Sequence, residues 1–280
     1  MEAPASGARP RRSSGRNLPV AIASGVALAA IFIVTLLVHP LVFLGFIGIL
    51  AVMALLELDV AFRQQGLRPA TPIAVSAGLV MLFGTYVAGP SAQSLGLVLL
   101  VLGTLAWVLL DTGRRRVVAS IGSTLLMALW VPFLVSFLGL LLVRENGLWL
   151  VMAVVALSVT NDIGAFAFGS RFGRRLLAPT VSPAKSWEGF AGGMGTALVV
   201  AGVVTGPFVP GIDLLTALIL AAGVVIASTV GDLAESLVKR DLGIKDLGTV
   251  VPGHGGIMDR ADAVIFAVPT AHLLLLALGH

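Results

Sequence analysis

The stretch IDLLTALILAAGVVIASTVGDLAESLVKR, residues Ile212 to Arg240, is almost wholly apolar as far as Val230 and then becomes charged, and no proline interrupts it. An α-helix rises about 1.5 Å per residue, so this stretch predicts a helix about 43 Å long. The hydrocarbon core of a bilayer is only about 30 Å thick. We therefore expect a membrane-spanning helix whose last turns project beyond that core and carry the charged residues.

The rest of the chain has the same apolar character. Hydrophobic residues make up 58% of its 280 residues and charged residues only 11%, whereas a soluble domain has roughly a quarter charged residues. The composition therefore predicts an integral membrane protein. The absence of cysteine excludes disulfides, thiolate metal sites and cysteine nucleophiles. The four histidines are too scattered in sequence to indicate a zinc site.

Nine apolar stretches are long enough to span a membrane, which takes about 17–25 residues. They cover approximately residues 18–38, 41–60, 71–88, 92–110, 117–143, 147–168, 190–209, 212–238 and 261–279. If the N-terminal tail is cytoplasmic and nine spans alternate, 17 of the 18 lysine and arginine residues lie on the cytoplasmic side, and Arg144 alone lies outside. Positive charge marks the cytoplasmic face, so we expect nine spans, the N-terminus inside and the C-terminus outside.

This topology predicts an all-α polytopic bundle. Residues 1–17 are expected to form a basic, disordered cytoplasmic tail, and residues 18–280 a single transmembrane domain with its catalytic part at about 147–280. No loop is long enough for a soluble domain, and no internal repeat is visible. The basic residues lie in short loops, so membrane topology explains them better than nucleic-acid binding does.

Polar residues within or at the ends of the predicted spans are the first candidates for function. Asn161 and Asp162 have apolar residues on both sides in the sixth span, and an ionisable group inside a span is a functional-site candidate by default. The alternative is that Asp162 pairs with a loop arginine and fixes helix packing. Glu57 and Asp59 end the second span, where an interfacial position explains them more simply.

The eighth span carries a polar face where it leaves the membrane. Asp232, Glu235, Ser236 and Lys239 share this face by their spacing of three, four and seven residues. An ion pair from Glu235 to Lys239 is favourable at this spacing and by itself explains Glu235. It does not explain Asp232, which follows Gly231 at the membrane boundary.

The charged loop after this span combines glycines with acids. The segment PGHGG at residues 252–256 lets the backbone approach a ligand and present its N–H groups to phosphate. Asp259 and Asp262 follow, and capping a helix N-terminus accounts for one of them. With Asp232 and Asp246 nearby they indicate a hard-cation site, since Mg²⁺ bound to phosphates commonly uses one or two carboxylates. The neighbouring lysines and arginines are expected to hold phosphates, so this loop predicts phosphoryl or nucleotidyl transfer.

The sixth loop, SRFGRRLLAPTVSPAKSWEGFAGG at residues 170–193, has a similar character. Its cations are suited to lipid headgroups or to a substrate phosphate: Arg171, Arg174, Arg175 and Lys185. Trp187 is more simply an interfacial anchor than a residue that stacks on a base. Ser182 and Glu188 are typical of a helix entry.

Three segments resemble the phosphatidate cytidylyltransferase family, whose members are also called CDP-diacylglycerol synthases. The longest is Ser236-x-Val238-Lys239-Arg240, then Lys245-Asp246, then Pro252-x-His254-Gly255-Gly256-Ile257-x-Asp259-Arg260-x-Asp262. The pair at 161–162 and the segment at 182–189 resemble family segments in the expected order. The departures are small: Ala184 stands where lysine is frequent, Phe166 where tyrosine is frequent, and Val251 and Ala261 where larger aliphatic residues are usual.

The resemblance implies transfer of CMP from CTP to phosphatidic acid, giving CDP-diacylglycerol and pyrophosphate, at the cytoplasmic face of the cell membrane. It implies Mg²⁺, with K⁺ as a candidate second ion, and we expect a homodimer. The expected metal ligands are Asp232, Asp246 and Asp259, with Asp162 and Asp262 as further ligands. Catalytic roles are expected for Asp246, Asp259, Lys239 and Arg240. Substrate contacts are expected from Lys245, Arg260, His254, Gly255, Gly256, Ser182, Lys185, Asn161 and Ser236.

Two other functions are compatible with such a chain. An ion-coupled secondary transporter could use Asp162 and Asp232 as ion sites, but transporter sites usually lie near the midplane between related repeats, and here the charges gather at one face. A CTP-dependent kinase of polyprenol or dolichol is the second alternative. It would release CDP instead of pyrophosphate.

Overall fold

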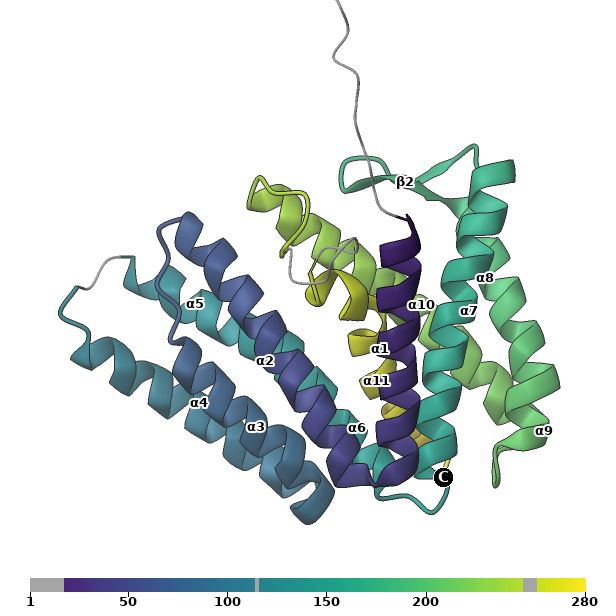
Figure 1. Cartoon of the computed structure of the whole chain (residues 1–280), viewed down its shortest axis with the longest axis horizontal. Coiled ribbons are helices and arrows are strands. Elements are labelled where there is room, and N and C mark those ends of the chain that lie inside the picture. Colours follow the sequence, from purple (N-terminus) through teal and green to yellow (C-terminus); the bar gives the residue numbers. More distant parts are fainter. Residues whose placement is uncertain (1–17, 114–115, 249–255) are drawn as a thin grey trace, which may run out of the picture.

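A computed structural model of the chain describes residues 18–113, 116–248 and 256–280. Its described elements, shown in Figure 1, are almost all helices. In chain order they are α1 (Leu18–Val38), α2 (Pro40–Gln64), α3 (Thr71–Ala88), α4 (Pro90–Leu110), α5 (Val117–Ala128), η1 (Leu129–Phe133), α6 (Leu134–Leu142), α7 (Gly147–Phe172), β1 (Leu176–Ala178), β2 (Ser182–Ser186), α8 (Trp187–Val200), η2 (Ala201–Thr205), α9 (Gly206–Phe208), α10 (Leu214–Asp241) and α11 (Met258–Ala277).

Within the described residues, eight helical runs are long and apolar enough to cross a membrane. The expected fifth span is one run built from α5, η1 and α6, and the expected seventh is the run of α8, η2 and α9. In α1 the apolar segment Ala23–Val38 is shorter than these eight runs. The all-α polytopic class is therefore confirmed. One addition to it is the antiparallel hairpin of β1 and β2, which lies within the expected sixth loop.

A wide helical turn interrupts the run of α5 and α6. The π turn η1 contains Pro132, which has no N–H to donate and whose ring clashes with the preceding turn of an α-helix. Helix α3 lies against this proline at a glycine: a Cβ atom built on Gly78 would lie 2.6 Å from the Pro132 ring. Proline and glycine thus set how closely α3 approaches the η1 turn.

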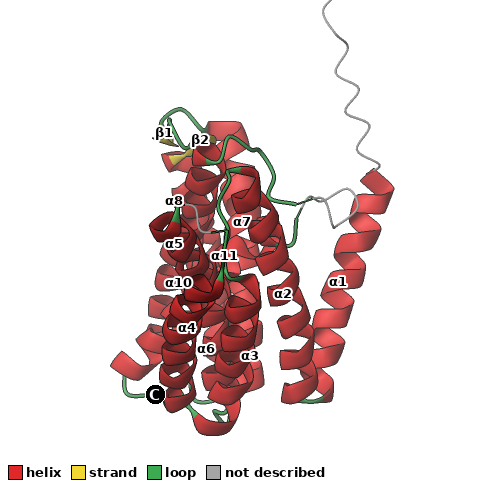
Figure 2. Ribbon diagram, turned by 90° about the vertical axis from the view of Figure 1, so that its left-hand side faces the viewer, coloured by secondary structure: helices red, strands yellow, loops and turns green. Residues whose placement is uncertain are grey.

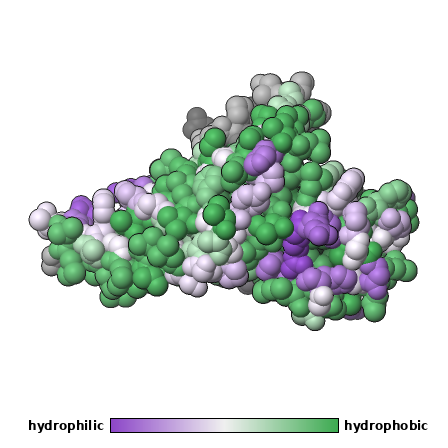
Figure 3. All heavy atoms as spheres, turned by 90° about the horizontal axis from the view of Figure 1, so that it is seen from below, coloured by the Kyte–Doolittle hydropathy of each residue, from purple (hydrophilic) through white to green (hydrophobic). Residues whose placement is uncertain are grey.

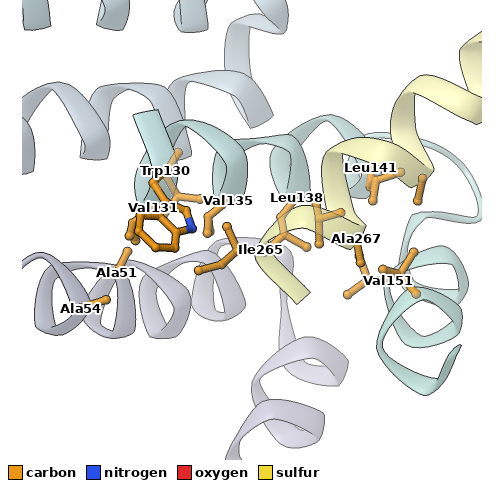
Figure 4. Close-up of a cluster of buried hydrophobic side chains, with 14 of the residues drawn as sticks. Ala51, Ala54, Trp130, Val131, Val135, Leu138, Leu141, Val151, Ile265 and Ala267 are labelled. Atoms are coloured by element: carbon orange, nitrogen blue, oxygen red, sulfur yellow. The ribbon is translucent and has the colours of Figure 1, made fainter. Parts of the chain in front are cut away.

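The buried core runs through the middle of the bundle, where α2, α6, α7 and α11 meet. Figure 4 shows side chains of these helices and of η1 pointing toward one another, with Val135 near Ile265 of α11 and Trp130 beside Val131 on the side of α2. Packing of this kind holds helices together in a bilayer, where lipid tails are as apolar as the side chains. At the edge of the bundle α1 contacts α2 (Figure 2), and the Phe32 and Phe43 rings meet edge to face with centroids 5.0 Å apart.

The two ends of the bundle differ. The β1–β2 hairpin and the C-terminal end of α10 lie at one end, and the C-terminus of the chain lies at the other (Figures 1 and 2). Figure 3 looks onto that other end and shows many apolar side chains, with the largest group of hydrophilic residues on one side and smaller groups elsewhere. The polar residues singled out in the sequence belong to the end that carries the hairpin.

Candidate functional site

A cavity of about 410 Å³ lies between α7, the β2–α8 segment and α10. Apolar side chains such as Phe166 and Phe190 form part of its wall. Its polar lining combines residues from three separate segments: Asn161, Asp162, Lys185, Ser186, Ser228 and Asp232. Four of these residues were predicted from the sequence, and the fold brings them into one pocket.

Helix α7 supplies Asn161 and Asp162 to the pocket because it packs unusually close to α8. A Cβ atom on Gly193 of α8 would lie 2.9 Å from the Asn161 carbonyl oxygen, so only glycine permits this approach. Asn161 is buried, with 3% of its surface exposed. Within the described residues its side-chain oxygen has no hydrogen-bond partner. A buried amide oxygen of this kind is available to a ligand that donates a hydrogen bond or a positive charge.

The β1–β2 hairpin is tied down at the start of α8. The Ser186 hydroxyl caps α8 by accepting the Gly189 N–H at 3.1 Å. The Glu188 carboxylate accepts the backbone N–H groups of Arg174 and Arg175 at 3.1 and 3.2 Å. Glu188 thus lies at the helix entry, as expected from the sequence, whereas the residue that caps α8 is Ser186 and not the expected Ser182, which begins β2.

An ion pair crosses the pocket. Lys185 on β2 pairs with Asp232 on α10. Both side chains are partly exposed, 22% and 37%, so water screens this pair and a polar ligand can compete for it. The pair places one cation and one anion next to each other at the mouth of the pocket, where a phosphate and a cation would need them.

Three carboxylates gather beside Asp232 and form what we call the acidic cluster: Asp232, Glu235 and Asp262, each with an oxygen within 4.8 Å of the others. Glu235 and Asp262 are buried, with 2% and 8% of their surface exposed. Among the described residues, Glu235 Oε1 is buried without a hydrogen-bond partner. Buried like charges repel each other strongly. An all-oxygen donor set with an unpartnered carboxylate oxygen fits a hard divalent cation.

Lys239 joins the acidic cluster to the start of α11. Its ammonium group donates to Glu235 Oε2 at 2.6 Å and to Asp259 Oδ1 at 2.8 Å. The other oxygen of Asp259 accepts the N–H groups of Leu247 and Gly256 at 3.2 and 2.8 Å. Asp259 therefore holds together the two ends of the connection between α10 and α11, and Lys239 is committed to two carboxylates.

The remaining predicted residues lie around this centre. Lys245 and Asp246 are exposed in the loop after α10, outside the acidic cluster. Arg240 is exposed, and its Nε donates to the Val181 carbonyl at 3.5 Å. Other predicted residues keep to their elements: Ser236 half-buried on α10, Ser182 at the start of β2, Gly256 buried before α11 and Arg260 exposed in the first turn of α11. His254 and Gly255 lie outside the described residues.

Two glutamates have contacts that their sequence context did not predict. Glu235 had been assigned to an ion pair with Lys239, which is present, but it also belongs to the acidic cluster. Glu57, placed at an interface in the sequence analysis, is buried and accepts the N–H groups of Ile257 and Met258. The available signal for Glu235 was its three-residue spacing from Asp232. No local signal links Glu57 to α11.

Comparison with known proteins places these residues in a family context. A family model described as "Cytidylyltransferase family" matches residues 19–278. A phosphatidate cytidylyltransferase of Mycobacterium tuberculosis is 32% identical over 292 residues, covering 98% of this chain and 88% of that protein. One from Mycobacterium leprae is 33% identical over 279 residues, covering 94% and 88%. One from Pseudomonas aeruginosa is 38% identical over 231 residues, covering 78% and 81%.

Proposed function

This chain belongs to the cytidylyltransferase family, and we propose that it transfers CMP from CTP to phosphatidic acid, giving CDP-diacylglycerol and pyrophosphate. The observation that carries the proposal is the family match over residues 19–278, which includes every segment of the pocket and of the acidic cluster. The relatives bearing the name phosphatidate cytidylyltransferase support the choice of substrates.

The chemistry of the substrates agrees with the residues of the pocket. The second pKa of a phosphate monoester is about 6, so phosphatidate is largely doubly ionised at neutral pH and needs no general base. Its oxygen forms a bond to the α-phosphorus of CTP while the bond from that phosphorus to the bridging oxygen breaks, and pyrophosphate leaves with that oxygen. The barrier is repulsion between two polyanions. Lys185 at the mouth of the pocket is placed to lower it, with Arg240, Lys245 and Arg260 as further phosphate contacts.

A divalent ion, Mg²⁺ by family resemblance, fits the acidic cluster because that cluster offers three carboxylates and an unpartnered oxygen. When bound, the ion would neutralise charge on phosphate oxygens of the substrates. We propose Asp232, Glu235 and Asp262 as the residues that hold it. Asp162, Asp246 and Asp259 remain candidate ligands, and K⁺ a candidate second ion.

We further propose nine spans with the N-terminus in the cytoplasm and the C-terminus outside. The support is the segregation of 17 of 18 lysine and arginine residues to one side and the eight described spanning runs together with α1. This orientation puts the pocket at the cytoplasmic face, where CTP is available and the lipid headgroup lies. A homodimer belongs to the same proposal, and light scattering of the detergent-solubilised protein tests it.

The reaction is tested with purified protein, CTP labelled at the α-phosphate, phosphatidic acid and Mg²⁺. We expect a labelled CDP-lipid and one pyrophosphate for each lipid formed. We expect Asp232→Asn to lower the turnover number by about 100-fold or more, because it removes a proposed ligand of the ion. Release of CDP would support a lipid kinase, and ion flux in liposomes without any CDP-lipid would support a transporter.

Asp213→Asn is the matched control on the same helix. Asp213 caps the opposite end of α10 by accepting the Thr216 N–H at 2.8 Å, and hydrogen bonds from Thr216 hold the pKa of its carboxyl below the ordinary value. Asparagine is an equally good helix cap. The control should therefore keep wild-type turnover. If Asp232→Asn also keeps it, the assignment of Asp232 to the ion fails.

A further inference from the structure

We propose that Glu57 is a positioning residue whose buried carboxylate fixes the N-terminus of α11, and through it the place of Asp262 in the acidic cluster. The inference rests on the proposed function, because it concerns the divalent-ion site of that reaction. Glu57 lies on α2, about two hundred positions away in the sequence, and does not line the pocket between α7, β2 and α10.

The contacts of Glu57 are directed at the start of α11. Its Oε1 accepts the Ile257 N–H at 2.9 Å, and its Oε2 accepts the Met258 N–H at 3.1 Å. The first N–H groups of a helix have no partner within the helix, and a carboxylate there is favoured by the helix dipole as well. Glu57 is 5% exposed, so water does not offer these N–H groups an equivalent partner.

The connection between α10 and α11 also packs against the Glu57 carboxyl group. A Cβ atom built on Gly248 would lie closer than 3.0 Å to the Glu57 carboxyl carbon, and one built on Gly256 would collide with Oε2. Both glycines therefore bring bare backbone against Glu57. These two residues flank positions 249–255 in the sequence, so both flanks of that segment meet at one side chain.

The position of the first turns of α11 determines where one carboxylate of the acidic cluster lies. Its first two turns carry Asp259, which binds Lys239, and Asp262, which belongs to the cluster. Helix α10 meets α11 at Gly231, where a Cβ atom would collide with the Asp262 carbonyl oxygen. Close packing at Gly231 sets the distance between the two helices, and Glu57 sets how far along its axis α11 begins. Groups behind metal ligands that orient them in this way change metal affinity by about 10–100-fold when they are replaced.

The test measures divalent-ion binding directly, in the absence of CTP and lipid. Mn²⁺, the paramagnetic stand-in for Mg²⁺, is titrated into purified full-length protein in detergent and followed by electron paramagnetic resonance. We expect Glu57→Gln to weaken Mn²⁺ binding by about 10-fold, because a side-chain amide offers one acceptor oxygen where two N–H groups need one each. We expect Asp232→Asn to abolish this Mn²⁺ binding, which would show that the measured ion binds at the acidic cluster.

Two matched controls separate positioning from general damage. Asp59→Asn makes the same charge change on the same helix, at a residue that binds Arg63 and Thr71 instead of α11, and should bind Mn²⁺ as wild type does. Gly248→Ala disturbs the Glu57 carboxyl group from the loop that packs against it, so the inference can still be tested if Glu57→Gln does not fold. Its control is Gly45→Ala on α2, where an added Cβ atom meets nothing within 4 Å.

Weaker Mn²⁺ binding in Glu57→Gln or Gly248→Ala, with unfolding temperatures close to those of their controls, would support the proposal. Wild-type Mn²⁺ affinity in both variants would overturn it, and so would a wild-type protein that binds no Mn²⁺. The proposed function fails by a different result, namely a wild-type protein that binds Mn²⁺ but forms no CDP-lipid. In that case the Mn²⁺ affinities of the variants still decide the role of Glu57.

Discussion

Lys239 lies between two carboxylates and, in the absence of substrate, binds both of them. Its ammonium group is 2.6 Å from Glu235 Oε2 and 2.8 Å from Asp259 Oδ1. Only 15% of the lysine side chain is exposed, and Glu235 is almost fully buried. Removing one group from a buried network of three charged groups costs more stability than the energy of any single pair in it would suggest, because the remaining charges are left buried without a partner.

Replacing Lys239 by methionine therefore tests the arrangement at the scale of one residue. The change keeps most of the aliphatic stem and leaves two acids without their cation. We expect it to destabilise the protein by on the order of 3 kcal/mol, measured by thermal unfolding in detergent at neutral pH. Lys245→Met, at an exposed loop position, should leave the unfolding temperature unchanged. Equal unfolding temperatures for the two variants would show that Lys239 is not committed to its acids.

Asp246 and Asp259 were predicted as equivalent ligands, but their surroundings differ. Asp259 accepts Lys239 and two backbone N–H groups, whereas Asp246 is exposed in the loop. We expect both Asp→Asn variants to lower CDP-lipid formation, and only Asp259→Asn to lower the unfolding temperature as well. Turnover and thermal unfolding measured on the same preparations check this. Wild-type turnover in both would remove these two acids from the reaction.

At the scale of elements, three devices bring the polar residues together at one end of the bundle. Helix α10 runs unbroken to Asp241, as its sequence predicts, so its last turns extend beyond the apolar part. The β1–β2 hairpin returns Lys185 to that helix. Glycines then let α7 and α8 approach closely, as small residues do between membrane helices.

The α7–α8 contact is tested with two glycines of α8 that are two positions apart. A Cβ atom on Gly193 would collide with the Asn161 side chain, whereas one on Gly195 meets nothing within 4 Å. We expect Gly193→Ala to lower both turnover and unfolding temperature by moving Asn161 out of the pocket wall. Gly195→Ala should be neutral or stabilise by up to about 1 kcal/mol through helix propensity. Identical behaviour of the two variants would contradict the close packing.

At the scale of the whole molecule, charge and hydrophobicity are arranged for a bilayer. Large apolar side chains face outward on many described helices, as expected where lipid replaces water. The basic loops and the pocket share one end of the bundle, and Arg144 lies at the other. An enzyme that joins a water-soluble nucleotide to a lipid phosphate needs its pocket at such a boundary.

Orientation in the membrane can be measured with single cysteines, because the natural chain contains none. Gln64 is the last residue of α2, and Glu145 lies in the connection between α6 and α7; both are exposed, and they lie at opposite ends of the bundle. In intact cells we expect a membrane-impermeant maleimide to label Glu145→Cys and to label Gln64→Cys only after the membrane is opened. The reverse pattern would place the pocket outside the cell and would exclude cytosolic CTP as its substrate.

The membrane class, the approximate bounds of the spanning runs and the family could all be predicted from the amino-acid sequence, because apolar length, charge distribution and short motifs are local properties of the chain. The sequence also placed Asp232 and Glu235 on one face of α10, since a three-residue spacing does so in any helix. It did not reveal the β1–β2 hairpin, whose three- and five-residue strands are too short for a periodic pattern.

Which acidic side chains lie next to each other could be seen only once the helices were packed together. Asp259 and Asp262 lie one turn apart on α11, but Asp262 belongs to the acidic cluster while Asp259 binds Lys239. Glu57 reaches α11 from a helix near the start of the chain. Such partnerships depend on how each helix is rotated and shifted against its neighbours. Packing of whole helices sets those two quantities, and no spacing along the sequence encodes them.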